Sequence, residues 1–197
     1  MPRKEHIANE CPWWSETYGL DRFITSTSSC NRENAGPNSN NKLDLSFFPL
    51  QDKDMVTIVN ASNRYIAQLT FRGCGQLTDD GIHTLADNWH ARGMMDCLDA
   101  RLQGHLNQNL IRLDLSKCVQ LTDASCESIA KFARLLSLNL SDCSRMGDDG
   151  LLHVLNGCKY LEEIQLANLH RLQDEGMSYI IRNLMIMKRL RIMGEFQ

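Results

Sequence analysis

The sequence of 197 residues lacks the features of several common protein classes. No run of about 18 or more apolar residues occurs, so we expect no transmembrane helix. Residues 1–6 carry charges with no apolar stretch behind them, which predicts neither a secretion signal nor a mitochondrial presequence. The net charge is only −3, so we expect no broad attraction to nucleic acid or to a membrane surface. These absences favour a cytoplasmic protein with one main domain.

Motifs of catalysis and metal binding are also missing. The eight cysteines include no Cys-x-x-Cys pair, and no Cys/His cluster has zinc spacing. No glycine-rich loop precedes a Lys-Ser/Thr pair, and no histidine stands in a Ser/His/Asp or Cys/His pattern that spacing supports. We therefore predict that the protein is not an enzyme and holds neither a metal nor another cofactor.

What the sequence does contain is an internal repeat. The motif L-x-L recurs, and its second apolar residue falls at positions 45, 71, 115, 140, 166 and 192. The steps between copies are 26, 44, 25, 26 and 26 residues. Three places after the motif stand Cys74, Cys118 and Cys143 in three of the copies, and we interpret these thiols as small buried side chains.

The second half of each unit predicts a helix. An aspartate is followed at the third, sixth and seventh positions by apolar residues, which is the stripe of one helix face. We interpret these aspartates as helix N-caps whose carboxylates accept from free N–H groups of the first turn: Asp52, Asp79, Asp123, Asp148 and Asp174. Each unit is thus a short strand, a turn and a capped helix.

The full unit, L-x-x-L-x-L-x-x-C-x-x-L, resembles the leucine-rich repeat in its cysteine-containing subtype, which occurs in F-box leucine-rich proteins. The resemblance covers about residues 41–197. It implies an α/β solenoid of about six repeats, with a parallel sheet on the concave face and helices on the convex face. Residues 1–41 carry no recognisable F-box.

We expect the binding residues on the concave face and at the two ends. The polar residues that alternate with the leucines should point outward from the sheet: Asp44, Thr70, Arg72, Arg112, Asp114, Asn139, Gln165, Arg189 and Arg191. Large apolar residues near the two ends are further candidates: Trp13, Trp14, Leu190, Ile192 and Phe196.

Three segments depart from the repeat. Residues 1–41 comprise an aromatic part (11–24) and a Ser/Asn-rich linker (25–41), and we weigh a cap, a partner anchor and disorder for them. The long step contains an insert at about 90–107 with a helical stripe, which is either a connector or a projecting contact element. No helix follows the strand at 190–192, so residues 194–197 cover this end, another molecule covers it, or the chain is truncated.

These features predict a non-catalytic protein–protein interaction or scaffold module in a larger hetero-complex, with no nucleic acid and no membrane insertion. Some relatives of this repeat subtype are subunits of cytoskeletal machines, including the axonemal dynein regulatory complex, so the resemblance implies a cytoskeletal or axonemal context. The alternative that it implies is a substrate-recognition subunit of a cullin-RING ubiquitin ligase.

Overall fold

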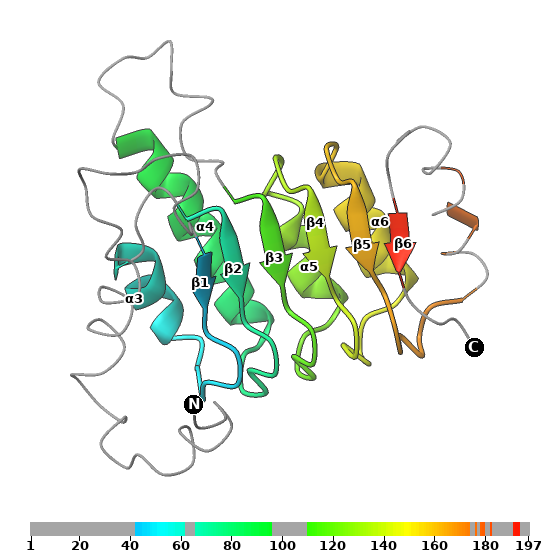
Figure 1. Ribbon diagram of the computed structural model, residues 1–197, viewed down its shortest axis with the longest axis horizontal. Helices are drawn as coiled ribbons and strands as arrows, with labels where there is room; N and C mark the ends of the chain where they lie inside the picture. Colours follow the sequence, from blue (N-terminus) through cyan, green and yellow to red (C-terminus); the bar gives the residue numbers. More distant parts are fainter. Residues whose placement is uncertain are drawn as a thin grey trace.

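The computed structural model describes residues 42–61, 66–95, 110–173, 176, 178, 179, 182 and 191–193. Six short strands form one parallel sheet in chain order: β1 (Lys42–Asp44), β2 (Gln68–Thr70), β3 (Arg112–Asp114), β4 (Ser137–Asn139), β5 (Glu163–Gln165) and β6 (Arg191–Met193). Each strand lies beside the strand of the next repeat, as Figure 1 shows. The predicted parallel sheet is confirmed.

The helices cover one face of this sheet (Figure 1). They are α3 (Asp54–Ala61), α4 (Asp79–Met95), α5 (Asp123–Ile129) and α6 (Asp148–Gly157), and each packs against its neighbour along the chain. We call the sheet face without helices the concave face and the helix side the convex face. No helix of the described part is both long and apolar enough to cross a lipid bilayer.

The core lies between the sheet and the helices and consists of the apolar columns of the repeat. The two leucine positions of strands β1 to β5 are buried, as Leu43 with Leu45 and Leu113 with Leu115 illustrate. The predicted helix stripes are buried too, for example Ile82, Leu85 and Ala86 in α4. One strand and one helix cannot bury both of their apolar faces alone, so stacking on the next repeat is what stabilises each unit.

A left-handed residue follows each of the strands β1 to β5. Five residues at the same repeat position have φ between 60° and 71°: Phe47, Gly73, Lys117, Asp142 and Asn168. This conformation turns their N–H groups toward the following repeat, so that Phe47 N donates to the Arg72 carbonyl (2.7 Å) and Lys117 N donates to the Ser141 carbonyl (2.9 Å). The turns thus extend the hydrogen-bonded ladder beyond the three-residue strands.

The prediction of helix N-caps was wrong for Asp52, Asp79, Asp123 and Asp148, whereas Asp174 lies outside the described residues. Asp79, Asp123 and Asp148 are the first helical residues, and the residues before two of them, Thr122 and Gly147, occupy the N-cap position. Their carboxylates instead accept from the next repeat. The backbone N–H and the hydroxyl of Thr122 donate to Asp79 (2.8 and 2.6 Å), and those of Thr78 donate in the same way to Asp52 (2.9 and 2.7 Å).

Two further aspartates complete this pattern. Gly147 N donates to Asp123 Oδ1 (2.7 Å), and Gln173 N donates to Asp148 Oδ1 (2.9 Å). In a solenoid, the equivalent backbone N–H group recurs in every repeat. A carboxylate at the start of one helix can therefore accept a hydrogen bond from that N–H group in the next repeat. A prediction made from the single unit assigned the carboxylate to its own helix and missed the neighbouring repeat.

The last strand and the insert were also predicted incompletely. The motif Leu190-Arg191-Ile192 places Ile192 opposite Leu166, but the observed register pairs Ile192 with Ile164 and Arg191 with Glu163. A shift of two residues preserves the alternation of a strand, so the pattern alone cannot detect it. Helix α4 continues through Met95, into the insert predicted at 90–107, whereas residues 96–107 lie outside the described part.

Candidate functional site

The described part of the concave face carries the polar positions that the sequence predicted. Asp44, Thr70, Asp114, Asn139 and Gln165 occupy the third position of strands β1 to β5 and are partly exposed. Parallel pairing joins Asp44 to Thr70 and Thr70 to Asp114, and continues through Asn139 to Gln165. The fold therefore brings residues up to 121 positions apart, from 44 to 165, into one row across the sheet.

Three members of this row are already engaged in the structure of their own strand. Asp44, Asp114 and Asn139 each accept a hydrogen bond from the backbone N–H two residues later, at 3.1, 2.9 and 3.0 Å. This is the short-range bond that Asx residues form at turns. These side chains shape the strand ends, so they have fewer free acceptor positions for a partner than the sequence suggests.

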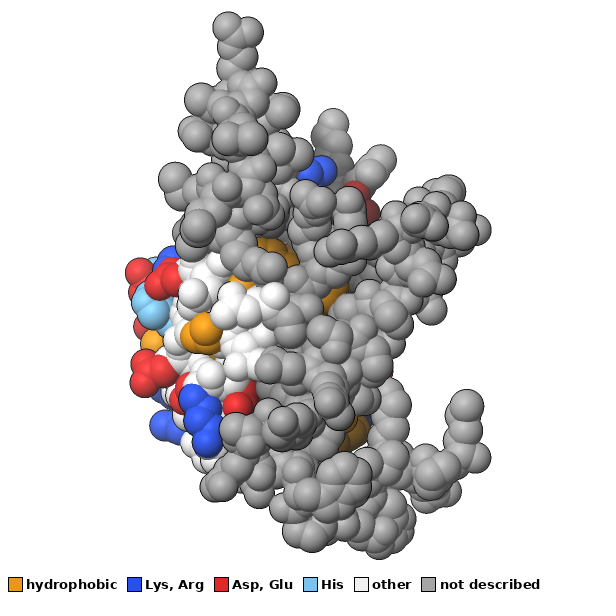
Figure 2. All heavy atoms as spheres, turned by 90° about the vertical axis from the view of Figure 1, so that its left-hand side faces the viewer, with side chains coloured by type: hydrophobic (Ala, Val, Ile, Leu, Met, Phe, Trp, Pro, Cys, Tyr) orange, Lys and Arg blue, Asp and Glu red, His pale blue; other side chains and the backbone are white. Residues whose placement is uncertain are grey.

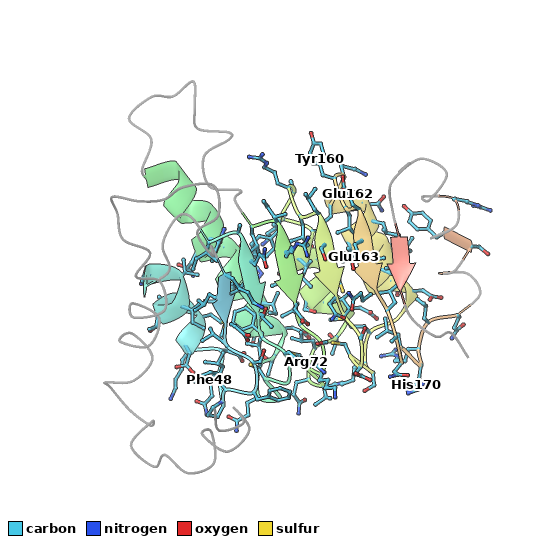
Figure 3. All side chains as sticks on the ribbon, in the orientation of Figure 1. Phe48, Arg72, Tyr160, Glu162, Glu163 and His170 are labelled. Carbon is cyan, nitrogen blue, oxygen red and sulfur yellow. The ribbon has the colours of Figure 1, made fainter. Side chains whose placement is uncertain are left out.

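Arg72 and Arg112 are the predicted residues most open to a partner. Both are exposed, and neither has an ion pair within the described residues. Lys42 begins the row that contains Arg112 and lies 3.9 Å from Asp44, a contact at the surface that contributes little to stability. The labelled Arg72 in Figure 3 comes from the turn after β2.

The other half of the concave face is bound together by side-chain hydrogen bonds. Ser137 Oγ donates to Glu163 (3.4 Å), and Gln165 Nε2 donates to the second carboxylate oxygen of Glu163 (3.2 Å). The Glu162 and Glu163 side chains are labelled beside β5 in Figure 3. This half presents carboxylate and amide groups, in contrast to the arginines of the first half.

The predicted residues at the two ends are mostly outside the described part. Trp13, Trp14, Arg189, Leu190 and Phe196 belong to this group. Arg191 and Ile192 form the backbone of β6, at the register positions opposite Glu163 and Ile164. The binding roles predicted for these residues therefore stay predictions.

An exposed aromatic residue was missed by the sequence reasoning. Tyr160 is 65% exposed and lies just before the N-terminal end of β5, where Figure 3 shows it projecting from the rim of the sheet. Ile111, before β3, is exposed at the same end of the sheet. The sequence contained a signal for this exposure. Tyr160 falls outside every apolar column of the repeat, whereas the neighbouring Leu161 falls inside one.

The cysteine column has a structural role. The thiols of Cys74, Cys118 and Cys143 donate to carbonyl groups of the preceding repeat, at 3.3, 3.1 and 3.2 Å. Burial raises the pKa of Cys74 and of Cys143 from the ordinary 9.0 to about 12 and raises that of Cys118 still further. Such thiols stay protonated at neutral pH, which makes them poor nucleophiles and poor metal ligands.

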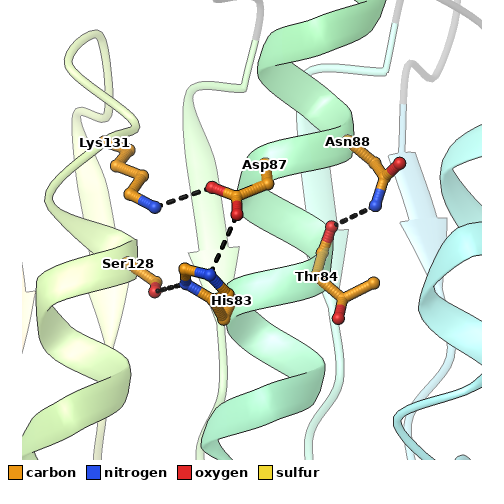
Figure 4. A network of polar contacts seen from close by, with 6 residues as sticks. All are labelled: His83, Thr84, Asp87, Asn88, Ser128 and Lys131. Carbon is orange, nitrogen blue, oxygen red and sulfur yellow. Dashed lines mark hydrogen bonds and ion pairs between the residues drawn. The ribbon is translucent and has the colours of Figure 1, made fainter.

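One polar cluster on the convex face is a Ser/His/Asp arrangement that sequence spacing did not support. His83 Nε2 lies 3.0 Å from Asp87, and His83 Nδ1 lies 3.1 Å from the Ser128 hydroxyl of the next repeat (Figure 4). Spacing could not reveal this, because Ser128 is 45 residues from His83. Lys131 Nζ binds the same Asp87 carboxylate at 2.6 Å.

The geometry of this cluster suits a bridge between helices rather than a nucleophile. Ser128 is only 4% exposed, which leaves its hydroxyl little access to a substrate. The Asp87 carboxylate is shared with Lys131, and the His83 side chain is 60% exposed to water. The cluster therefore joins α4 to α5 at the surface.

A polar cleft of about 790 Å³ lies beside α6, toward the end of the described chain. Its lining carries both signs of charge and includes Asp148, Asp149, His170, Arg171 and Arg182. Asp148 already accepts from Gln173 N, and Arg171 donates to the Arg145 carbonyl (3.0 Å). Within the described residues no group of three or more His, Cys, Asp or Glu side chains could hold a metal ion.

The surface seen in Figure 2 has the same mixed character. Acidic, basic and histidine side chains lie close together along the edge of the described part, with isolated apolar side chains between them. A mixed surface of this kind offers no broad field of one sign. Any charge-based recognition must therefore come from a local arrangement.

Comparisons with known proteins agree with the repeat architecture. A leucine-rich-repeat family model matches residues 106–130 and 135–153. The structure is similar to that of leiomodin-1 actin-binding site 2, with a TM-score of 0.56 and 13% identity over 76% of this chain and 82% of that one. The fold is an α/β leucine-rich-repeat solenoid, and its repeats carry the cysteine position.

A second similarity is weaker. A chain in the crystal structure of the yeast Rad7 and Elc1 complex matches with a TM-score of 0.40 and 17% identity, over 72% of this chain and 37% of that one. A score of this size is too low to establish a common fold. The match covers little more than a third of that chain.

Proposed function

We propose that this protein is a non-catalytic protein-binding module and a subunit of a larger assembly, which binds its partner on the concave face. The observation that carries the proposal is the row of partly exposed polar side chains that runs across β1 to β5 with exposed Arg72 and Arg112 beside it. A leucine-rich-repeat fold supports protein binding as a general function.

The absence of an enzymatic role is part of the same proposal. Two observations support it: the buried thiols have raised pKa values, and Ser128 is shielded from substrate. The concave face itself offers carboxylates that are already bound to backbone N–H groups, as in Asp44 and Asp114. Such groups suit recognition better than acid–base chemistry.

We favour a cytoskeletal or axonemal assembly in the cytoplasm as the more specific context. The support is the resemblance of the cysteine-containing repeats to subunits of cytoskeletal machines. Leiomodin-1 has an actin-binding site of the same fold, and this makes actin filaments a first candidate for testing. A likeness at 13% identity shows the fold alone, so the choice of actin depends on the experiment.

A second candidate is the substrate-recognition subunit of a cullin-RING ligase. The observation that favours it is the cysteine column, since Cys74, Cys118 and Cys143 stand at the position that this subtype shares with F-box leucine-rich proteins. The two candidates differ in the expected partner, which is a fixed set of structural proteins in the first case and a Skp1-type adaptor with a cullin in the second.

A tagged pull-down from native cells, with mass spectrometry of the captured proteins, tests both. The wild type is compared with a concave-face variant, Arg112→Glu with Gln165→Arg, and with a convex-face control, Glu127→Lys with His153→Ala. All four residues lie in the described part, and both convex residues are exposed. We expect the concave variant to lose partners that the control keeps, at an unchanged melting temperature.

The identity of the captured proteins then separates the two candidates. Structural proteins in fixed stoichiometry support the scaffold, and cosedimentation with actin filaments tests the actin candidate directly. An adaptor and a cullin support the ligase. Equal capture by the wild type and the concave variant contradicts binding on this face.

A further inference from the structure

Charge divides the concave face into two halves. The strands β1 to β3 with their following turns carry four exposed cations: Lys42, Arg72, Arg112 and Lys117. We call this the basic half. The strands β4 and β5 with the residues beside them, 137–142 and 162–168, contain three acidic residues, Asp142, Glu162 and Glu163, and neither lysine nor arginine. We call this the acidic half.

The carboxylates of the basic half offset only part of its positive charge, because Lys42 pairs with Asp44 at 3.9 Å while three further cations remain. Asp44 accepts from the N–H and the hydroxyl of Ser46, at 3.1 and 2.6 Å, and Asp114 accepts from Ser116 N at 2.9 Å. Both are only partly exposed, whereas the two arginines of this half are exposed and have no ion pair within the described residues. With four cations against two carboxylates, Asp44 and Asp114, the basic half has a net positive charge.

The four cations frame an area that a short segment can cover. Lys42, Gln68 and Arg112 are in one register row, so the two cations of the row are two strands apart, or about 10 Å. Arg72 and Lys117 lie beyond the other end of the strands, in the turns that follow β2 and β3. Several carboxylates of one peptide can meet these cations together.

We propose that the basic half of the concave face binds an acidic segment of a protein partner. This inference rests on the proposed function and adds the chemistry of the partner to it. Complementary charge determines how the segment lies on the concave face. The acidic half repels the carboxylates of the segment, so they bind only over the strands β1 to β3. Arg191 of β6 lies beyond the acidic half, at the register position next to Glu163.

The experiment uses the full chain and two fluorescein-labelled probes, a twelve-residue peptide of alternating glutamate and serine and a matched peptide of lysine and serine. Fluorescence anisotropy at low and at 0.3 M salt gives the affinity of each. We expect the glutamate peptide to bind at low salt and to weaken as salt is added, because exposed charge pairs are screened. Arg72→Glu with Arg112→Glu should lower this affinity about tenfold or more.

The matched control is Glu163→Gln, which removes a charge from the acidic half and should leave the affinity of the glutamate peptide unchanged or slightly higher. Carbodiimide cross-linking locates the probe, since it joins a carboxylate to a lysine in direct contact. We expect links to Lys42 or Lys117 and none to Lys131, which lies on the convex side and pairs with Asp87.

Three outcomes would overturn the inference: preference for the lysine peptide, equal binding by the arginine double variant, or cross-links that avoid Lys42 and Lys117. Association of the chain with itself, seen by light scattering and abolished by either charge change, would assign the face to a second copy instead. If cellular partners are captured in a way that depends on the concave face but the glutamate peptide fails, the acidic partner is wrong while the proposed function stands.

Discussion

The Asp79 carboxylate receives two hydrogen bonds from Thr122, one from its backbone N–H at 2.8 Å and one from its hydroxyl at 2.6 Å. The two residues are 43 positions apart, on either side of the longest connection between repeats. A shorter step separates the equivalent pair of Asp52 and Thr78, yet the bonds have nearly the same length. The repeat boundary therefore keeps one local geometry whatever length of chain lies between.

This relationship predicts a large loss of stability on removal of the Asp79 carboxylate. We expect Asp79→Ala to lower the free energy of unfolding by about 2–3 kcal/mol, because charge-assisted bonds are lost and the N–H of Thr122 keeps no partner. The control is Asp80→Ala, an exposed residue in the same helical turn, with an expected loss below about 1 kcal/mol. Urea denaturation followed by circular dichroism measures both. Equal losses would show that Asp79 acts only on its own helix.

The glycines behind these carboxylates predict a second pair of variants. A Cβ atom at Gly150 would lie 2.5 Å from Asp123 Oδ1 and 2.9 Å from Cys126 Sγ, so Gly150→Ala must displace the inter-repeat bond. We expect a loss of more than about 2 kcal/mol. A Cβ atom at Gly75 meets nothing within 4 Å, so Gly75→Ala should be neutral or slightly stabilising. Thermal melts of the two variants measure these effects. An unchanged melting temperature for Gly150→Ala would contradict the close contact of Gly150 with Asp123 and Cys126.

The buried thiols predict a dependence of stability on alkaline pH. Burial raises the pKa of Cys74 from 9.0 to about 12, so between these values the unfolded chain has lost a proton that the folded chain keeps. The free energy of unfolding then falls as pH rises above 9, by about 1.4 kcal/mol per pH unit for this thiol, and does not change through Cys74 below pH 9.

Comparison with Cys74→Ala isolates this contribution. The stability difference between wild type and variant should shrink by about 2 kcal/mol between pH 9 and pH 10.5, since only the wild type carries this thiol. Urea denaturation at three pH values measures the difference. A constant difference over this range would mean that the Cys74 thiol ionises as easily in the folded as in the unfolded chain.

We expect no serine-hydrolase reactivity in the cluster of Ser128, His83 and Asp87. A fluorophosphonate probe, which labels activated serines, should leave Ser128 unmodified, because only 4% of the residue is exposed. A serine hydrolase in the same reaction confirms the probe. Mass spectrometry that finds the label on Ser128 would reverse the assignment and reopen an enzymatic role for the convex face.

Sequence reasoning was strongest where one repeat unit contains the whole cause. The apolar columns predicted the buried residues of strands and helices, as Leu43 and Ile82 show. It failed where the cause lies in the neighbouring repeat. Asp79 binds Thr122, and His83 meets Ser128, through contacts that appear only once the units are stacked. The register of β6 failed for a different reason, because the alternation is the same after a shift of two residues.

The candidate site divides in the same way. Periodicity by itself determined which residues face outward on the strands, because a strand alternates its side chains between two faces. The tertiary structure decided which of them remain available, since Asp44, Asp114 and Asn139 turn to the backbone N–H groups at their strand ends. The parallel register of β1 to β3 also brings their cations together. The pairing of the strands sets the distance between side chains of different repeats, such as Lys42 and Arg112.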